Sequence, residues 1–195
     1  MNLFVVVMFM TAAIFSSCGA KQQVAQSSKS TKPFGPTSEM PCQIYDTPKE
    51  FAATTAWRGS KNKMDEVRFH ALEEAQNIIK LKVRRSYKGL MSEYKVSWGT
   101  NAGNDVADKM EMACDNVLEG MLNETSESCI RWGDIDEDGH LYCYIAIKIS
   151  KEELADKSAK AVKNLLTEDE KRRIDFREEE FRKKLDERYE SFKNE

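Results

Sequence analysis

The chain has 195 residues, of which 32% are charged, and a formal net charge of −3 at neutral pH. This length allows one domain with its own core and an appendage. The lack of a basic excess excludes a protein that binds nucleic acid through its charge, so we expect no nucleic-acid partner. No stretch after Ile14 is long and apolar enough to span a membrane.

The first eighteen residues predict an export signal that ends in a lipid anchor. Every residue of the segment 3–14 except Thr11 is apolar, which is the length of a signal-peptide core and too short for a transmembrane helix. Small residues precede Cys18. The stretch resembles a bacterial lipoprotein precursor, which implies removal of residues 1–17 and acylation of Cys18. Two or three acyl chains, such as palmitate, would then anchor the mature chain in a membrane.

Two features differ from the usual lipoprotein signal. Phe15 stands three residues before the cysteine, where Leu, Val or Ile is usual, and no Lys or Arg precedes the apolar core. The alternative is an ordinary secretory signal cut after Ala20, which would release a soluble exported protein.

After Cys18, the composition predicts a flexible tether up to residue 40. This segment is rich in Ser, Gln, Lys, Gly and Pro and has few apolar residues. A coil of this length has an end-to-end distance of about 25 Å. No acidic cluster follows Cys18, which favours the periplasmic side of an outer membrane.

Four more cysteines follow: Cys42, Cys114, Cys129 and Cys143. In an oxidising compartment they allow two disulfides with three connectivities. Cys129 with Cys143 is the best candidate pair, because a hairpin centred near Asp136 would place them opposite each other. Alternatively, Cys114 on a helix and Cys129 and Cys143 in strands are buried free thiols. Their spacing matches no zinc motif, and we expect no cofactor.

The pattern from residue 41 onward predicts alternating strands and helices. Residues 51–57 are rich in strand formers. Apolar residues spaced by three and four predict an amphipathic helix over residues 64–83. Residues 87–98 mix aromatic residues with Val and Met and predict a strand that is interrupted near Gly89.

The strongest periodicity predicts a second helix over residues 106–121, with its methionines as core residues. Residues 125–132 and 140–149 predict two strands of a hairpin. Ser150 with Glu153 matches a capping box and predicts a third helix. The expected fold class is α+β: a small sheet of about four strands with two amphipathic helices packed on it, within residues 41–166, followed by C-terminal helices.

The predicted hairpin loop contains a partial calcium-binding motif. Asp134, Asp136, Asp138 and Gly139 match the first half of a calcium-binding loop, in which alternate carboxylates converge on the ion. The position of the closing bidentate Glu is occupied by Ile145. A solvated turn is therefore the preferred interpretation, and calcium binding is the alternative.

Residues 167–195 predict a charged C-terminal helix that begins with a second capping box, Thr167 with Glu170. Of these 29 residues, 11 are acidic and 9 are basic. A solvated helix with i,i+4 ion pairs is one interpretation. The other is a helix that binds a partner or its own copy. The apolar stripe that supports it is narrow: Ile174, Phe181, Leu185, Tyr189 and Phe192.

Several short patterns follow one another along the chain. They are residues 56–60 (AWRGS), Ala71 with Ala75, residues 118–120 (LEG), and Gly139, Tyr142 and Ile145. Together they resemble the bacterial twenty-kilodalton outer-membrane lipoprotein family, which is similar to a domain of flagellar assembly lipoproteins. The resemblance covers about residues 41–149. It implies a small α+β domain, attachment to the outer membrane and no known catalytic residues.

The function expected from these features is a lipid-anchored, non-enzymatic scaffold or adaptor of the cell envelope. One alternative is a ligand- or calcium-responsive periplasmic binding domain. Another is an envelope hydrolase in which His140, beside the three loop aspartates, acts as a base. The sequence contains no nucleophile elbow and no phosphate-binding glycine loop.

Overall fold

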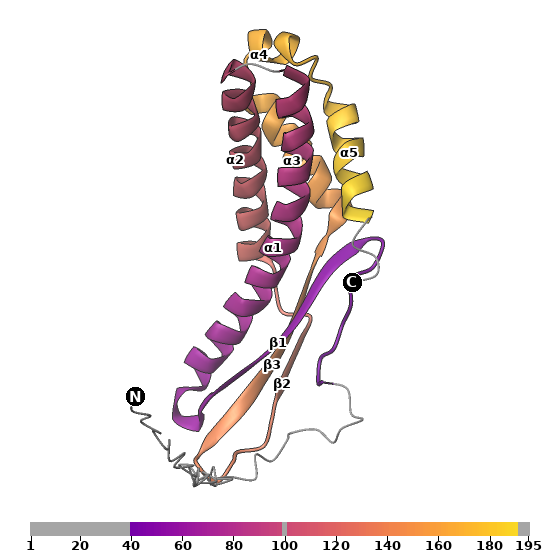
Figure 1. Cartoon of the computed structure of the whole chain (residues 1–195). Coiled ribbons are helices and arrows are strands. Elements are labelled where there is room, and N and C mark those ends of the chain that lie inside the picture. Colours follow the sequence, from indigo (N-terminus) through magenta and orange to yellow (C-terminus); the bar gives the residue numbers. More distant parts are fainter. Residues whose placement is uncertain (1–39, 99–100, 191–195) are drawn as a thin grey trace, which may run out of the picture. The chain divides into compact units, whose positions relative to one another are not determined.

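The computed structural model describes residues 40–98 and 101–190, which form an α+β fold (Figure 1). The elements follow in the order β1 (Glu50–Ser60), η1 (Lys61–Lys63), α1 (Met64–Trp98), α2 (Asn101–Glu124), β2 (Cys129–Trp132), β3 (His140–Ser150), α3 (Lys151–Leu165), α4 (Glu168–Arg173) and α5 (Glu178–Glu190).

The sheet has three antiparallel strands in the order β1-β3-β2. Strand β1 pairs with β3 along its whole length, from Glu50 opposite Ser150 to Ser60 opposite His140. The short β2 pairs with the other side of β3. The predicted hairpin is therefore confirmed, whereas the predicted fourth strand is not found in the described residues.

That fourth strand, predicted over residues 87–98, is the C-terminal part of the 35-residue helix α1. Tyr87, Leu90, Met91 and Tyr94 are buried and repeat at helical spacing, which the aromatic content of the segment concealed. Gly89 does not interrupt the helix. The nearest atoms to a Cβ at this position would be those of the Arg188 guanidinium in α5, the end of a flexible side chain.

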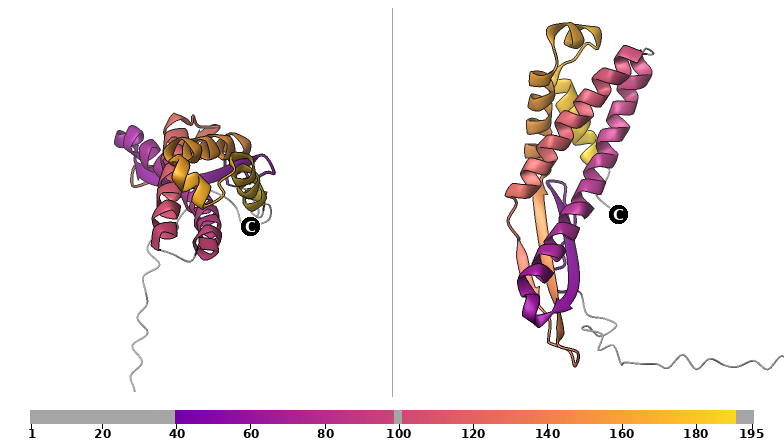
Figure 2. Two further views of the ribbon diagram at one scale, coloured as in Figure 1. Left: turned by 90° about the horizontal axis from the view of Figure 1, so that it is seen from above. Right: turned by 90° about the vertical axis from the view of Figure 1, so that its left-hand side faces the viewer.

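Helix α1 contributes to two parts of the core. Its N-terminal half covers one face of the sheet, where Thr55 Oγ1 donates a hydrogen bond to the carbonyl oxygen of Ala71 at 2.6 Å. Its C-terminal half joins a four-helix bundle, in which α1 contacts α2, α2 contacts α3, α3 contacts α5 and α5 contacts α1 (Figures 1 and 2). The sheet core and the bundle core form one continuous cluster of buried apolar residues.

The C-terminal segment belongs to this domain and is not a separate appendage after residue 166. Phe181, Leu185 and Tyr189 of α5 are at most 1% exposed, and Ile174 is also buried. The narrow apolar stripe therefore packs against the chain's own α1 and α3. Phe192, the last residue of the predicted stripe, lies outside the described residues.

Side-chain caps start α3 and α4 as predicted. The Ser150 hydroxyl accepts the Glu153 N–H at 3.2 Å at the start of α3. Thr167 and Glu170 form a complete capping box at the start of α4, with a hydrogen bond in each direction. Within residues 40–98 and 101–190, none of the helices is both long enough and apolar enough to cross a bilayer.

Candidate functional site

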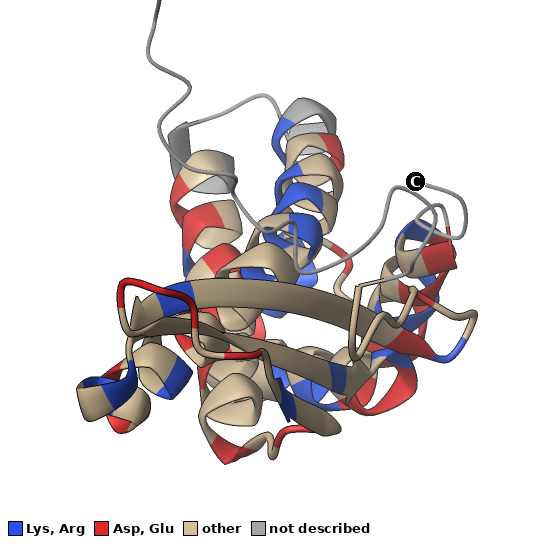
Figure 3. Cartoon of the chain, turned by 90° about the horizontal axis from the view of Figure 1, so that it is seen from below, with Lys and Arg blue, Asp and Glu red and all other residues tan. Residues whose placement is uncertain are grey.

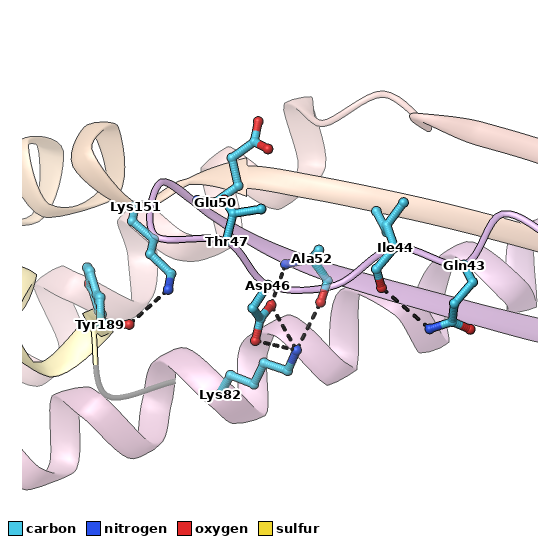
Figure 4. A network of polar contacts seen from close by, with 9 residues as sticks. All are labelled: Gln43, Ile44, Asp46, Thr47, Glu50, Ala52, Lys82, Lys151 and Tyr189. Carbon is cyan, nitrogen blue, oxygen red and sulfur yellow. Dashed lines mark hydrogen bonds and ion pairs between the residues drawn. The ribbon is translucent and has the colours of Figure 1, made fainter. Parts of the chain in front are cut away.

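Residues 40–49, here named the strap, run back beside the first half of β1 before the chain turns into that strand (Figure 4). Two hydrogen bonds of the Thr54 hydroxyl hold the strap: it accepts the Ile44 N–H and donates to the Cys42 carbonyl oxygen, both at 3.0 Å. The Thr47 N–H donates to the Glu50 carbonyl oxygen and closes the turn. The strap is thus attached to the sheet largely through side chains.

A disulfide between Cys42 and Cys129 ties the strap to β2, so the predicted pair of Cys129 with Cys143 is wrong. In the actual register Cys129 lies opposite Ala146, and Cys143 lies opposite Trp132. Cys129 and Cys143 therefore do not lie opposite each other in the register, and their side chains point to opposite faces of the sheet. The prediction assumed a symmetric hairpin, and only the tertiary path of the strap brings Cys42 to β2.

Asp46 and Lys82 close the free edge of β1 at Ala52 (Figure 4). Asp46 Oδ1 accepts the Ala52 N–H at 2.7 Å, and Lys82 Nζ donates to the Ala52 carbonyl oxygen at 2.9 Å. The ammonium and the carboxylate also form an ion pair at 2.9 Å. An exposed strand edge is a template for unwanted pairing, and this contact satisfies both edge groups of one residue.

A buried lysine lies where the sheet meets the helical bundle. Lys151 is only 3% exposed, and its ammonium donates to the Tyr189 carbonyl oxygen at 2.8 Å near the end of α5 (Figure 4). The same ammonium lies 4.6 Å from the centroid of the Phe51 ring, which packs edge-on against Tyr189. A cation is favoured both at a helix C-terminus and over an aromatic ring. Lys151 therefore links β1, α3 and α5.

Two buried tyrosines continue this junction into the bundle. The hydroxyl groups of Tyr87 and Ser158 lie 3.1 Å apart in a hydrogen bond, and the Tyr87 and Tyr189 rings are 6.5 Å apart. Burial raises the pKa of both phenols well above the usual value. Both tyrosines therefore pack in the core as neutral phenols.

An open pocket of about 670 Å³ lies beside the junction, between the strap turn, the start of α3 and one side of α5. Arg182 lines the pocket and forms ion pairs with Asp156, Glu152 and Asp186. Burial, followed by the neighbouring carboxylates, raises the pKa of Asp186. Both signs of charge line the pocket, so its walls select neither an anion nor a cation. Lys and Arg also alternate with Asp and Glu on the helices (Figure 3).

The hairpin loop uses the carboxylate of Asp136 to shape its turn. Oδ1 accepts the N–H groups of Asp138 and His140 at 3.1 and 2.8 Å, and Oδ2 accepts Nε of Arg58 at 3.0 Å. The backbone N–H of His140, followed by the Arg58 guanidinium, lowers the pKa of Asp136. Asp134 is exposed. The described residues contain no cluster of three or more His, Cys, Asp or Glu that could hold a metal ion.

His140 is the predicted base of the hydrolase alternative, and Cys114 and Cys143 are free thiols. Asp136 contacts the backbone of His140 and not its imidazole, so the loop forms no carboxylate–histidine pair. The free thiols of Cys114 and Cys143 are buried. Burial raises the pKa of Cys143 to about 11 and raises the pKa of Cys114 further still. A thiol with a raised pKa is a poor nucleophile at neutral pH.

Large apolar side chains are exposed on β1, in the first turns of α1 and on the hairpin. Trp57 is 41% exposed, and its ring lies 5.1 Å from that of His70, which in turn lies 5.6 Å from Phe69. Phe69 is 61% exposed. Trp132 and the loop residue Ile135 are exposed on β2 and after it. These five residues are here named the aromatic end.

The sequence pointed to only part of this arrangement. It indicated the loop aspartates and included Cys42 and Cys129 among the cysteines that could pair. It missed Lys82 and Lys151, because their roles depend on partners 30 or more residues away. Cys18, the predicted lipidation site, lies outside the described residues. Comparisons of the chain with models of known protein families, with curated proteins and with solved structures give no match.

Proposed function

We propose that the protein is exported, held on the periplasmic side of the outer membrane by acyl chains on Cys18, and acts there as a non-enzymatic scaffold or adaptor. The observation that carries the proposal is the disulfide between Cys42 and Cys129. Disulfides persist in oxidising compartments such as the periplasm and are rare in the cytosol. The disulfide therefore supports export independently of the apolar N-terminal segment.

The anchor is inferred from the sequence around Cys18. Small residues precede this cysteine, and a polar segment separates it from the strap. Two or three acyl chains give a stable anchor, whereas one chain binds reversibly. The resemblance of residues 41–149 to the twenty-kilodalton outer-membrane lipoprotein family supports the same location.

The adaptor role rests on the aromatic end. Aromatic side chains are enriched in protein–protein interfaces, and exposed apolar residues that gather at one end of a domain suit a partner surface. The stripe of α5, first considered for this role, is buried against α1 and α3. The partner surface that we propose is therefore formed by Trp57, Phe69 and their neighbours.

Intact mass analysis of the protein extracted from its native membrane tests the anchor. We expect a chain that begins at Cys18, carries two or three acyl chains and lacks two hydrogens because of its disulfide. The variant Cys18→Ser should lose both the added mass and its membrane attachment. A native chain that begins at Lys21 without fatty acid would overturn the anchor and leave a soluble exported protein.

The adaptor role is tested separately by crosslinking in intact cells. The double variant Trp57→Ser, Phe69→Ser should lose a crosslinked partner that the wild type retains. Leu81→Ser is the matched control, because Leu81 is 69% exposed on α1 outside the aromatic end. If the crosslinked species are the same for all three proteins, the aromatic end is not the partner surface.

A further inference from the structure

Two attachments of the strap differ in chemistry. At one point the Cys42–Cys129 disulfide fixes it covalently to β2. At the other, Asp46 is held by the Ala52 N–H and by Lys82. Between these points, the strap forms two hydrogen bonds with the Thr54 hydroxyl of β1. Loss of the covalent point would therefore leave residues 40–45 with few contacts to the sheet.

The disulfide lies in parts of the fold that can move without opening the core. Cys42 and Cys129 are both partly exposed, Cys129 starts a four-residue edge strand, and Cys42 lies outside any strand. Cys42 also has a backbone φ of 63°, in the left-handed region that L side chains rarely adopt. Cleavage of the disulfide would let this residue relax to an ordinary conformation.

The main core does not depend on the strap. Helix α1 covers the face of the sheet that carries Thr55 and Ile145, and this face joins the buried cluster of the bundle. By strand alternation, Ala52, Thr54 and Ala146 lie on the opposite face, next to the strap. Ala52 and Ala146 are 4% and 0% exposed. Release of the strap would uncover small residues of this face without opening the core.

We propose that the Cys42–Cys129 disulfide is a redox-controlled clasp that releases residues 40–45 from the sheet while the rest of the domain stays folded. A protein dithiol of the thioredoxin type supplies two electrons and two protons. Cys42 and Cys129 become thiols, and the dithiol becomes a disulfide. Release uncovers the face around Ala146. If the chain is anchored at Cys18, release also lengthens the tether by these six residues, and only this last consequence rests on the proposed function.

Native-state reduction of the full chain tests the clasp. The protein is treated with millimolar dithiothreitol without denaturant, alkylated with iodoacetamide and mapped by mass spectrometry. We expect Cys42 and Cys129 to become labelled, whereas the buried thiols Cys114 and Cys143 stay unlabelled. These two thiols act as an internal control, because labelling them requires opening of the core.

Hydrogen exchange reports the movement itself. On reduction, the Ile44 amide, which donates to Thr54, should exchange at least tenfold faster, while the amides of Ile145 and Ile147 in β3 should change less than twofold. The variants Cys42→Ser and Cys129→Ser should reproduce the exchange of the reduced protein without any reductant. Cys143→Ser is the control, because it removes a thiol that is not in the disulfide.

Three results would overturn the clasp. The disulfide could resist dithiothreitol until the protein is denatured. Cys114 and Cys143 could become labelled together with Cys42 and Cys129, or the strap amides could keep their protection after reduction. The first result would identify the disulfide as a permanent staple. The second would show that its reduction opens the core, and the third would show that the strap keeps its place without it. Because these measurements need no lipid, they are independent of the intact-mass test of Cys18.

Discussion

The Lys82 ammonium and the Asp46 carboxylate form a 2.9 Å ion pair that closes the free edge of the first strand. Their side chains are 28% and 10% exposed, so water screens the pair only in part. Both residues also bind the backbone of Ala52. The pair thus joins α1, the strap and β1 at one place.

Lys82→Met should lower the free energy of unfolding by about 2 kcal/mol, because it leaves a largely buried carboxylate and the Ala52 carbonyl group without their charged donor. Lys63→Met is the matched control. Lys63 pairs with Glu66 on the surface, where both side chains are more than 60% exposed, and its loss should cost at most about 0.5 kcal/mol. Urea unfolding measures both variants, and equal losses would contradict the structural role of the edge contact.

The burial of the α5 stripe predicts a contrast between two phenylalanines. Phe181 is fully buried between α5 and the rest of the bundle, and Phe181→Ala should destabilise the protein by about 3–5 kcal/mol. Phe69 is 61% exposed, and Phe69→Ala should change stability by no more than about 0.5 kcal/mol. Thermal or urea unfolding measures the difference.

The same pair of variants tests whether the stripe holds two copies together. Sedimentation of both variants, under conditions in which they are folded, should give the mass of the wild type. A lower mass for Phe181→Ala alone, with little loss of stability, would show that α5 is an oligomer interface and would contradict its burial in one chain.

Glu170 predicts a pH-dependent contribution to stability. The Lys109 ammonium, at 2.6 Å, and then the N–H and hydroxyl groups of Thr167 lower the pKa of Glu170 from 4.5 to about 2. Since the pKa is lowered in the folded state, the stabilisation is complete above pH 4.5 and is lost as the pH falls towards 2. The neutral variant Glu170→Gln lacks this contribution.

We therefore expect the stability difference between wild type and Glu170→Gln to be constant near neutral pH and to shrink between about pH 4.5 and pH 2. Urea unfolding at a series of pH values measures this difference. Glu179→Gln, at an exposed position of α5, is the control for the loss of one negative charge. A difference for Glu170→Gln that stays constant down to pH 3 would contradict the role of the capping box and of Lys109.

The structure of the hairpin loop predicts that calcium does not change the melting temperature. Both carboxylate oxygens of Asp136 already accept hydrogen bonds within the protein. Millimolar calcium should therefore leave the melting temperature unchanged, because a ligand raises stability only by binding the folded state. A rise in the melting temperature that is absent in Asp134→Ala would revive the alternative of a calcium-responsive domain.

Asp136 should instead matter for stability. Asp136→Ala should cost about 1–3 kcal/mol, because it leaves the amides of Asp138 and His140 without their acceptor. Asp134→Ala removes an exposed carboxylate from the same loop and should cost at most about 0.5 kcal/mol. Equal effects of the two variants would argue against the turn-forming role of Asp136.

Local patterns predicted the α+β class, the first two helices, the hairpin and the caps at Ser150 and Thr167. These features depend on residues that are close in sequence, such as the hydrogen bond from Glu170 to Thr167. Periodicity also extended into residues 87–98, but Gly89 and the aromatic residues of this segment favoured a strand. The helix continues there because Tyr87, Leu90 and Tyr94 enter a bundle core.

Tertiary structure decided which cysteines pair and where the C-terminal stripe is buried. Cys42 reaches Cys129 across 87 residues, through the path of the strap and the register of β2. Lys151 and Tyr189 meet because α5 folds back onto α3. Local periodicity carries no information on such distant contacts, because they depend on how whole elements pack and on the register that the packing imposes.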